Sequence, residues 1–402
     1  MPHAAMLTPE QARKISLIEV LLEEAEEQRP GMVQAPPEQA ALLWSEDEIR
    51  RYFNEQLSAT GTSSAIGGGN APLDGAETSR LLNGPVGQSL TPPRPPPAAP
   101  VSARCSPELL ARWFPGLPLS GTATPNPRAR ILAFHSAGNA EDMWTSEGTG
   151  PRRSPSPLLE WCRVNRVELL AVQMPGRGSR AREPFITNAQ AAAQALLPVV
   201  TPLLESSAGV SYAVLSHSFG CWVAFELLRA VRAAGLPQPR VWCLSAMPYP
   251  DVPYDKRPWR RQRTLDDTDF KEEMRGWDVN EVVFTRDMWQ LYEPILRADC
   301  TVFDEYELQP DASYDRAVRQ ASGGNTVEGP PPLEPFDFPI SAFWGNQDRR
   351  ISRGLVAPWA RYTRGGFTLR EIAGNHLWPI NNRQAKATWL TELVSALETA
   401  LV

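Results

Sequence analysis

The sequence predicts an α/β fold: a mostly parallel, doubly wound sheet with a helical lid inserted into it. From about residue 128 onward, short apolar strands alternate with amphipathic helices, the pattern of parallel strands joined by helical crossovers. One strand, Tyr212 to Leu215, passes almost directly into a helix over 220–234, with Ser218 at the turn. After Pro250 the alternation stops for roughly ninety residues, far more than an ordinary loop, and this insertion is the expected lid.

The periodicity of apolar residues places the individual elements. Strands are predicted at 130–134, 167–172, 212–215, 240–245, 340–344 and 367–372. Helices are predicted at 157–165, 188–206, 220–234, 266–275, 286–300, 352–363 and from 383 onward. The end of the lid, 309–337, is rich in Gly, Pro and Ser and is expected to be looped or disordered.

The composition divides the chain into three parts. Residues 1–58 are expected to form a helical N-terminal extension, with one helix over 8–29 and another starting at Ser45. Residues 59–127 are rich in Pro, Gly and Ser and are interpreted as a disordered linker. Residues 128–402 form the main domain, with the lid at about 250–337. The extension is either a solvated tail or a pair of helices that packs on the main domain, on another copy of the chain or on a partner protein.

The length, net charge and composition of the chain exclude several classes of function. The chain has 402 residues and a net charge of −6, which gives no basic surface for nucleic acid. Its five cysteines lack C-x-x-C spacing, which excludes a cysteine zinc site and fits isolated thiols in a reducing compartment. No metal and no cofactor is expected. No apolar run approaches the ~20 residues that span a bilayer, and the acidic N-terminus lacks the features of a secretory signal. We therefore expect a cytoplasmic protein with no membrane partner.

Ser218 lies at a turn with the character of a nucleophile elbow. A tight turn between strand and helix raises the serine Oγ above the sheet, and small residues are needed two positions before and after it because the backbones pass closely there. Gly220 meets this requirement, and Ser216, where the usual pattern has glycine, is small enough to fit. The alternative is an ordinary strand-to-helix turn that contains a serine.

A serine nucleophile needs a base, and the sequence holds four histidines. His3 lies in the N-terminal tail, His135 in the first loop of the domain, and His217 beside the serine, where neighbouring side chains diverge. His376 follows the last predicted strand, which is the place of the base in the chain order Ser, Asp, His. We expect His376 to be the base.

The acid that orients this histidine should follow a strand and precede His376. Asp348 does so, just beyond the strand that ends at Trp344. Asp299, on a predicted lid helix beside Arg297, is the competing candidate, but such a pair on a helix is more often structural. We expect Asp348 to be the acid.

Catalysis at the serine also requires two N–H donors that form an oxyanion hole. One donor should be the backbone N–H of Phe219, at the start of the helix after Ser218. The other should come from the loop after the first strand, at Ala137 or Ser136.

Five motifs occur in a characteristic order along the chain: F-H-S-A-G-N at 134–139, Q-M-P-G-R at 173–177, S-H-S-F-G at 216–220, P-I-L-R-A-D at 294–299 and G-N-H-L at 374–377. Together they resemble those of the type II thioesterases that accompany polyketide and nonribosomal peptide synthases, in the α/β-hydrolase superfamily. The resemblance covers about 130–400. His135, Ser216 and Asn375 depart from the family pattern, replacing a proline and two glycines.

The resemblance implies hydrolysis of acyl thioesters on the phosphopantetheine of an acyl or peptidyl carrier protein, or on CoA. Its catalytic triad falls on Ser218, His376 and Asp348. A carboxylesterase or lipase with the same triad, and a non-catalytic hydrolase fold that binds other proteins, are the alternatives. Apolar lid residues, Met274 and Trp289 among them, are expected to form the acyl pocket.

Overall fold

The computed structural model describes residues 45–58, 106–117, 126–148, 153–205, 210–311 and 333–401, together with the isolated positions 18 and 21. Contacts divide the chain into two units. The first comprises Met1–Ala103 and Gly148–Arg153, and the second comprises Arg104–Glu147 and Ser154–Val402. The sites discussed below all lie in the second unit.

In the first unit, helix α3 spans Glu46–Ser58. Ser45 and Glu48 form a capping box: the Ser45 N–H donates to Glu48 Oε2 at 2.6 Å, and the Glu48 N–H donates to Ser45 Oγ at 3.3 Å. Ile49 and Phe53 are buried on one face of the helix. The helix predicted from Ser45 is confirmed, whereas that predicted over 8–29 lies outside the described residues except at positions 18 and 21.

Six parallel strands form the sheet of the second unit, in the order β4-β1-β5-β6-β7-β8. The strands are β1 (Ala129–Phe134), β4 (Val167–Ala171), β5 (Ser211–His217), β6 (Trp242–Ser245), β7 (Ile340–Gly345) and β8 (Phe367–Ile372). All six predicted strands are confirmed, and every pairing in the sheet is parallel. A separate antiparallel pair joins β2 (Ser146–Glu147) to β3 (Ser154–Pro155).

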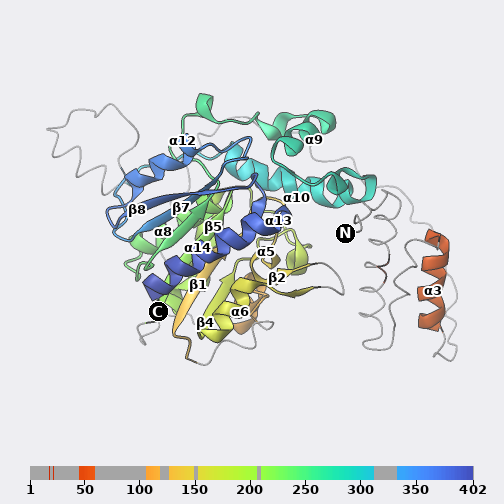
Figure 1. Cartoon of the computed structure of the whole chain (residues 1–402), viewed down its shortest axis with the longest axis horizontal. Coiled ribbons are helices and arrows are strands. Elements are labelled where there is room, and N and C mark those ends of the chain that lie inside the picture. The colour runs from red at the N-terminus through yellow and green to blue at the C-terminus, as the bar shows by residue number, and fades with distance from the viewer. Residues whose placement is uncertain are drawn as a thin grey trace, which may run out of the picture. The chain divides into compact units, whose positions relative to one another are not determined.

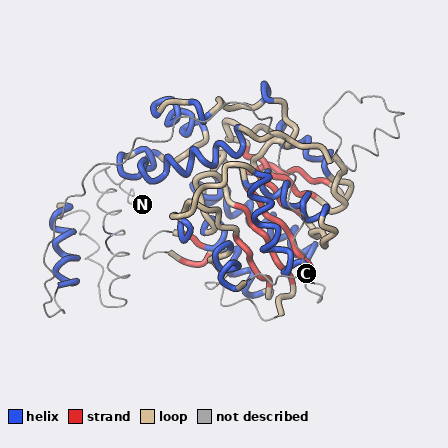
Figure 2. Tube along the Cα trace, turned by 180° about the vertical axis from the view of Figure 1, so that it is seen from behind, coloured by secondary structure: helices blue, strands red, loops and turns tan. Residues whose placement is uncertain are grey.

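Alternate residues of each strand face opposite sides of the sheet, and each side has its own hydrophobic core. Helices cover both sides, so the sheet is doubly wound. In β1, Leu132 and Phe134 enter one core, while Ile131 and Ala133 enter the other. Helices α7 (Ala189–Leu204) and α8 (Gly220–Ala233) cover the first face. Helices α6 (Pro157–Val164) and α14 (Arg383–Leu401) cover the second, where Figure 1 shows α14 lying across the strands. Figure 2 shows the strands between these layers from behind. The predicted fold class is confirmed.

One short helix corrects the predicted linker. Helix α4 (Pro107–Trp113) lies inside the segment 59–127, yet its Trp113 and the following Phe114 are buried in the core beneath α7. The Gln173 N–H donates to the Trp113 carbonyl at 2.8 Å, which ties α4 to the loop after β4. Ser106 caps the helix and Pro107 opens it, but the Pro-rich composition around them concealed this start signal. Residues 106–117 therefore belong to the folded unit, and the remaining domain boundaries stay predictions.

The predicted helical insertion between β6 and β7 is present (Figure 1). It contains the 3₁₀ turns η3 (Tyr254–Lys256), η4 (Gln262–Thr264) and η5 (Glu281–Phe284) and the helices α9 (Asp267–Gly276) and α10 (Arg286–Asp304). Residues 312–332, most of the segment expected to be looped or disordered, lie outside the described residues. We call the described part, 250–311, the lid.

Three short helical segments lie in the loops that follow β1, β4 and β8. They are α5 (Asp142–Thr145), η2 (Gly178–Arg180) and α13 (Trp378–Asn381). The helix predicted over 352–363 is instead α12 (Arg353–Val356) followed by the 3₁₀ turn η6 (Ala357–Tyr362). Pro358 explains this difference, because it lacks the N–H that a continuous α-helix would use. Within the described segments, no helix combines the length and apolar character needed to cross a membrane.

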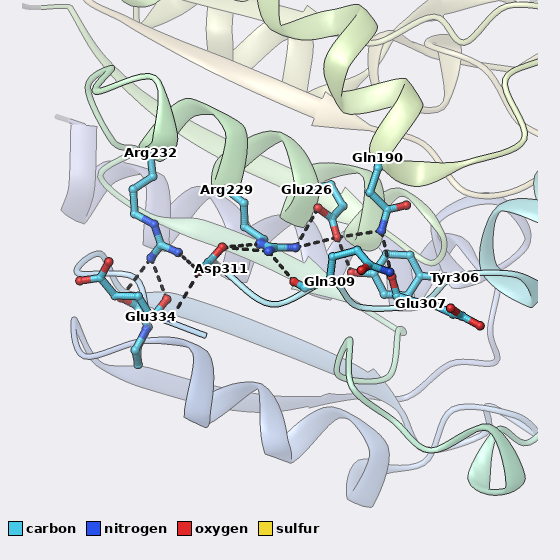
Figure 3. A network of polar contacts seen from close by, with 10 residues as sticks. Gln190, Glu226, Arg229, Arg232, Tyr306, Glu307, Gln309, Asp311 and Glu334 are labelled. Carbon is cyan, nitrogen blue, oxygen red and sulfur yellow. Dashed lines mark hydrogen bonds and ion pairs between the residues drawn. The ribbon is translucent and has the colours of Figure 1, made fainter. Parts of the chain in front are cut away.

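A polar network attaches the end of the lid to α8, the helix that begins after Ser218 (Figure 3). Arg229 and Arg232 of α8 each donate to a carboxylate oxygen of Asp311 at 2.8 Å. The Tyr306 hydroxyl donates to Glu226 Oε1 at 2.6 Å, beside Arg229. These contacts fix the chain leaving α10 against the outer surface of α8.

Candidate active site

The turn between β5 and α8 has the geometry of a nucleophile elbow. Ser218 has a φ of 54°, a left-handed conformation that is costly for a serine, and its N–H donates to the Ser245 carbonyl at 2.9 Å. A Cβ on Gly220 would lie 2.5 Å from the His135 carbonyl oxygen, so only glycine fits there. Ser216 is accommodated because its hydroxyl accepts a hydrogen bond from the Trp242 indole at 2.8 Å.

Three residues from three strand ends form a hydrogen-bonded chain. Ser218 Oγ lies 2.8 Å from His376 Nε2, and His376 Nδ1 lies 2.7 Å from Asp348 Oδ2. The other carboxylate oxygen of Asp348 accepts the N–H groups of Arg350 and Ile351 at 2.8 and 2.9 Å. This geometry matches a serine–histidine–acid triad, in which the acid holds the imidazole so that Nε2 faces the serine.

Burial alone would raise the pKa of Asp348, whose side chain is 0% exposed. The neighbouring His376, the hydrogen bond to its ring and the two backbone N–H donors outweigh burial and lower that pKa below its ordinary value. Asp348 is therefore a carboxylate at neutral pH, as a residue that stabilises an imidazolium must be.

The competing candidates occupy other positions. Asp299 lies on α10 and accepts two hydrogen bonds from Arg177, each 2.6 Å long, so it does not contact the histidine ring. His135 and His217 are buried, and burial lowers their pKa values to about 4 and about 3, which keeps both neutral. His3 lies outside the described residues.

Near Ser218, the N–H groups of Phe219 and Ala137 have no protein acceptor within the described part of the chain. The neighbours of Ala137 are engaged. The Ser136 N–H points to Met143 Sδ at 3.4 Å, and the Gly138 N–H donates to Asp299 at 2.8 Å. Of the two candidates in this loop, the hydrogen bonding therefore favours Ala137 over Ser136 as the second oxyanion donor.

The site lies where the strand order reverses. The chain runs from β1 to its neighbour β4 on one side and then returns to β5 on the other side of β1. Loops after β1 and β5 therefore diverge, and in open parallel sheets ligands bind in the crevice that this leaves. Ala137 follows β1 and Ser218 follows β5, so the two sides of the crevice carry the oxyanion loop and the nucleophile.

A cavity at Ser218 is bounded largely by the lid. Its apolar lid residues are Met274, Trp277, Val279, Leu296, Cys300 and Phe303. Met274 thus lines the cavity at Ser218, in agreement with its predicted place in the acyl pocket. Trp289 does not line this cavity: it packs against Phe270 and Phe284 within the lid, with ring centroids 5.7 and 5.6 Å apart, and its expected place in the acyl pocket is wrong.

Sequence reasoning missed three contacts of His376. The His217 ring nitrogen Nε2 lies 2.9 Å from the His376 carbonyl, and Asp278 Oδ2 accepts the His376 N–H at 2.9 Å. The Trp277 ring packs edge-on against the imidazole, with centroids 4.7 Å apart. Trp277 is one of the apolar lid residues that the sequence assigns to the acyl pocket, and it does line the cavity, but no local pattern points to its contact with His376 or to Asp278. For His217, its place beside Ser218 in the sequence predicts only that the two side chains diverge.

The fold and the site together define a serine hydrolase of the α/β-hydrolase class. Its oxyanion loop, triad and lid have the arrangement expected of enzymes that form an acyl-serine intermediate. The chain belongs to the thioesterase domain family, whose model matches residues 163–401, more than half of its length. The family resemblance seen in the sequence motifs is thereby confirmed.

Individual relatives agree with this assignment. The gramicidin S biosynthesis protein GrsT of Aneurinibacillus migulanus is 26% identical over 227 residues, which cover 56% of this chain and 77% of GrsT. The structure of RedJ, a thioesterase from the prodiginine pathway of Streptomyces coelicolor, matches with a TM-score of 0.54 and 24% identity over 68% of this chain and 88% of RedJ. YbtT, a type II thioesterase from the yersiniabactin pathway, matches with a TM-score of 0.51 and 20% identity over 69% and 96%. At these identities the structures show the fold alone.

Proposed function

We propose that this protein hydrolyses acyl thioesters carried on the phosphopantetheine of an acyl or peptidyl carrier protein, and so edits or releases chains during polyketide, nonribosomal peptide or fatty acid synthesis. One observation carries the proposal: the hydrogen-bonded chain Ser218–His376–Asp348 faces an apolar cavity in a member of the thioesterase family. The relative named for gramicidin S biosynthesis supports the substrate class.

The proposed reaction starts with attack of Ser218 Oγ on the thioester carbonyl carbon while His376 Nε2 takes the hydroxyl proton. The N–H groups of Phe219 and Ala137 stabilise the oxyanion that forms. The C–S bond then breaks, and His376 returns its proton to the departing thiolate, leaving an ester on Ser218. A water molecule, deprotonated by His376, attacks this ester and releases the carboxylic acid, and the serine recovers its proton. Asp348 holds the imidazole and stabilises its charged form in both halves.

A substrate comparison tests the proposal. The intact protein should show a higher kcat/KM for acyl-carrier or acyl-CoA thioesters than for the oxyester of the same acyl chain, and Ser218→Ala should abolish turnover of all three. A preference for the oxyester would indicate a carboxylesterase or lipase. Failure of a fluorophosphonate probe to label Ser218 would indicate a non-catalytic protein of the same fold.

The proposal also covers the role of the N-terminal helices and the cellular location of the enzyme. The N-terminal helical segment, of which α3 is described, serves as a docking surface for a partner protein, and the enzyme works in the cytoplasm. For α3, the support is its amphipathic pattern, with Ile49 and Phe53 buried and Arg50 and Arg51 exposed. Replacing both arginines with glutamate should raise KM for an acyl-carrier substrate and leave acyl-CoA turnover unchanged.

A further inference from the structure

Two carboxylates of the lid each accept a backbone N–H from a different loop of the active site. Asp299, on α10, accepts the Gly138 N–H at 2.8 Å, one residue beyond the oxyanion donor Ala137. Asp278, between α9 and η5, accepts the His376 N–H at 2.9 Å. The two loops follow β1 and β8, which are separated by three strands in the sheet, so the lid is the element that they share.

Each carboxylate is itself held in place. The Asp299 side chain is 0% exposed, and its two oxygens pair with the two terminal nitrogens of Arg177, which also donates to the Asn139 carbonyl at 3.0 Å. Such a bidentate pair fixes the carboxylate plane and aims its Oδ2 at the oxyanion loop. Lid helix, oxyanion loop and the loop after β4 therefore meet at one buried ion pair.

Asp278 is fixed by its backbone and by an arginine. Its φ of 62° is left-handed, a conformation that aspartate and asparagine tolerate better than other side chains. Its Oδ1 accepts the Arg349 guanidinium at 2.6 Å, and Arg349 follows Asp348 directly in the chain. The preceding lid residue, Trp277, packs on the His376 ring. Asp278 thus pairs with Arg349 in the loop that carries Asp348, and it accepts a hydrogen bond from His376 in the other loop.

We infer that Asp278 and Asp299 are positioning residues, through which the closed lid sets the geometry of both the base and the oxyanion hole. The inference rests on the proposed function, because it takes Ser218, His376 and Ala137 as the reacting groups. Closing the lid over an acyl chain then also completes the catalytic geometry, since the same segments that bound the cavity hold the two loops. An open lid leaves His376 and Ala137 less well placed for reaction.

Matched substitutions at Asp278 test this idea. Asp278→Gly keeps the left-handed backbone and removes the acceptor, whereas Asp278→Asn keeps both the backbone preference and an acceptor oxygen. We expect Asp278→Gly to lower kcat about 10–100-fold with little change in KM, because misplaced catalytic groups affect the reaction more than binding. Asp278→Asn should recover most of that loss. Asp299→Asn should lower kcat about tenfold.

The control is Glu272→Gln, which alters an exposed carboxylate on the lid helix α9, six residues before Asp278, that touches neither loop. Rates are measured with a p-nitrophenyl ester and with an acyl-CoA. A kcat of Asp278→Gly within twofold of wild type, or an equal loss in Glu272→Gln, would overturn the inference. If the wild-type protein cleaves only the oxyester, the proposed function fails while the effect of Asp278 can still be measured.

Hydrogen exchange of the unmodified protein tests the inference without substitutions. The amides of Gly138 and His376 should exchange at the rate at which α9 and α10 open. They should exchange more slowly than the amide of Ala137, which has no acceptor among the described residues. Exchange of Gly138 and His376 while the lid helices stay protected would refute the role of the lid.

Discussion

The Nε2 atom of His217 lies 2.9 Å from the backbone carbonyl oxygen of His376, so the residue before Ser218 holds the loop that carries His376. A nitrogen that donates to a carbonyl must carry its proton, which leaves His217 Nδ1 unprotonated in the neutral ring. Burial and the nearby His376 lower the pKa of His217 to about 3, so this neutral form persists well below neutral pH. Ser218 and His376 are thus linked twice, by the hydrogen bond between their side chains and through His217.

Stability should fall as the pH is lowered from 7 to 4. The unfolded chain protonates His135 and His217 near pH 6.5, whereas burial delays protonation in the folded state to about 4 and about 3. The unfolded state therefore binds more protons in this window, and the free energy of unfolding should drop by about 1.4 kcal/mol per pH unit for each histidine. Denaturant titrations at several pH values measure the slope. His217→Gln should reduce it, and an unchanged slope would mean that His217 titrates normally.

Removing either reacting side chain should abolish turnover. In Ser218→Ala and His376→Ala, kcat should fall by about 10⁴–10⁶-fold, because both groups take part in the covalent step. Circular dichroism of both variants should stay close to wild type. The unfolding midpoint should stay close to wild type in Ser218→Ala and fall in His376→Ala, because the latter leaves the buried Asp348 carboxylate without its imidazole partner. A folded Ser218→Ala that releases acyl groups at a near-native rate would show that another residue is the nucleophile.

The two aspartates should differ in their effect on kcat. Asp348→Asn should lower it by about 10⁴-fold, because an amide favours the wrong tautomer of His376. Asp299→Asn removes the negative charge opposite Arg177 and one of the two acceptor oxygens, which loosens the oxyanion loop, so its loss should be near tenfold. Steady-state kinetics of the two variants decide between them. The reverse ranking would make Asp299 the catalytic acid.

The preference for acyl chain length should depend on Met274 and not on Trp289. Met274 lines the cavity at Ser218, so Met274→Ala should enlarge it and shift the preference toward longer chains. Trp289 packs inside the lid, and Trp289→Ala should lower the free energy of unfolding by about 3–5 kcal/mol with the chain-length profile unchanged. Acyl-CoA substrates of graded length, assayed below the melting temperature of each variant, provide the profile. The same profile in Met274→Ala as in wild type would place the acyl pocket elsewhere.

The sequence alone determined the sheet and the three residues that form its hydrogen-bonded chain. Alternating strands and helices are local signals, and each strand's period of two residues already separates the two cores. Ser218 was found from its turn, because a strained strand-to-helix turn constrains the small residues at 216 and 220. His376 and Asp348 followed from chain order, and the structure brings His376 within hydrogen-bonding distance of Ser218 and Asp348 within hydrogen-bonding distance of His376.

Only the tertiary structure decided how the lid acts. Asp299 is separated from Arg177 and Gly138 by more than a hundred residues, and Asp278 by almost as many from His376, so no local pattern records these contacts. Trp289 and Met274 look alike as apolar lid residues, because one helical period cannot tell a side chain facing the cavity from one packed inside the lid. Likewise, the burial of Trp113 depends on a surface provided by α7, which the Pro-rich sequence around Trp113 does not reveal. Local periodicity fixes the elements, whereas the partners of a buried carboxylate are fixed by how distant segments pack.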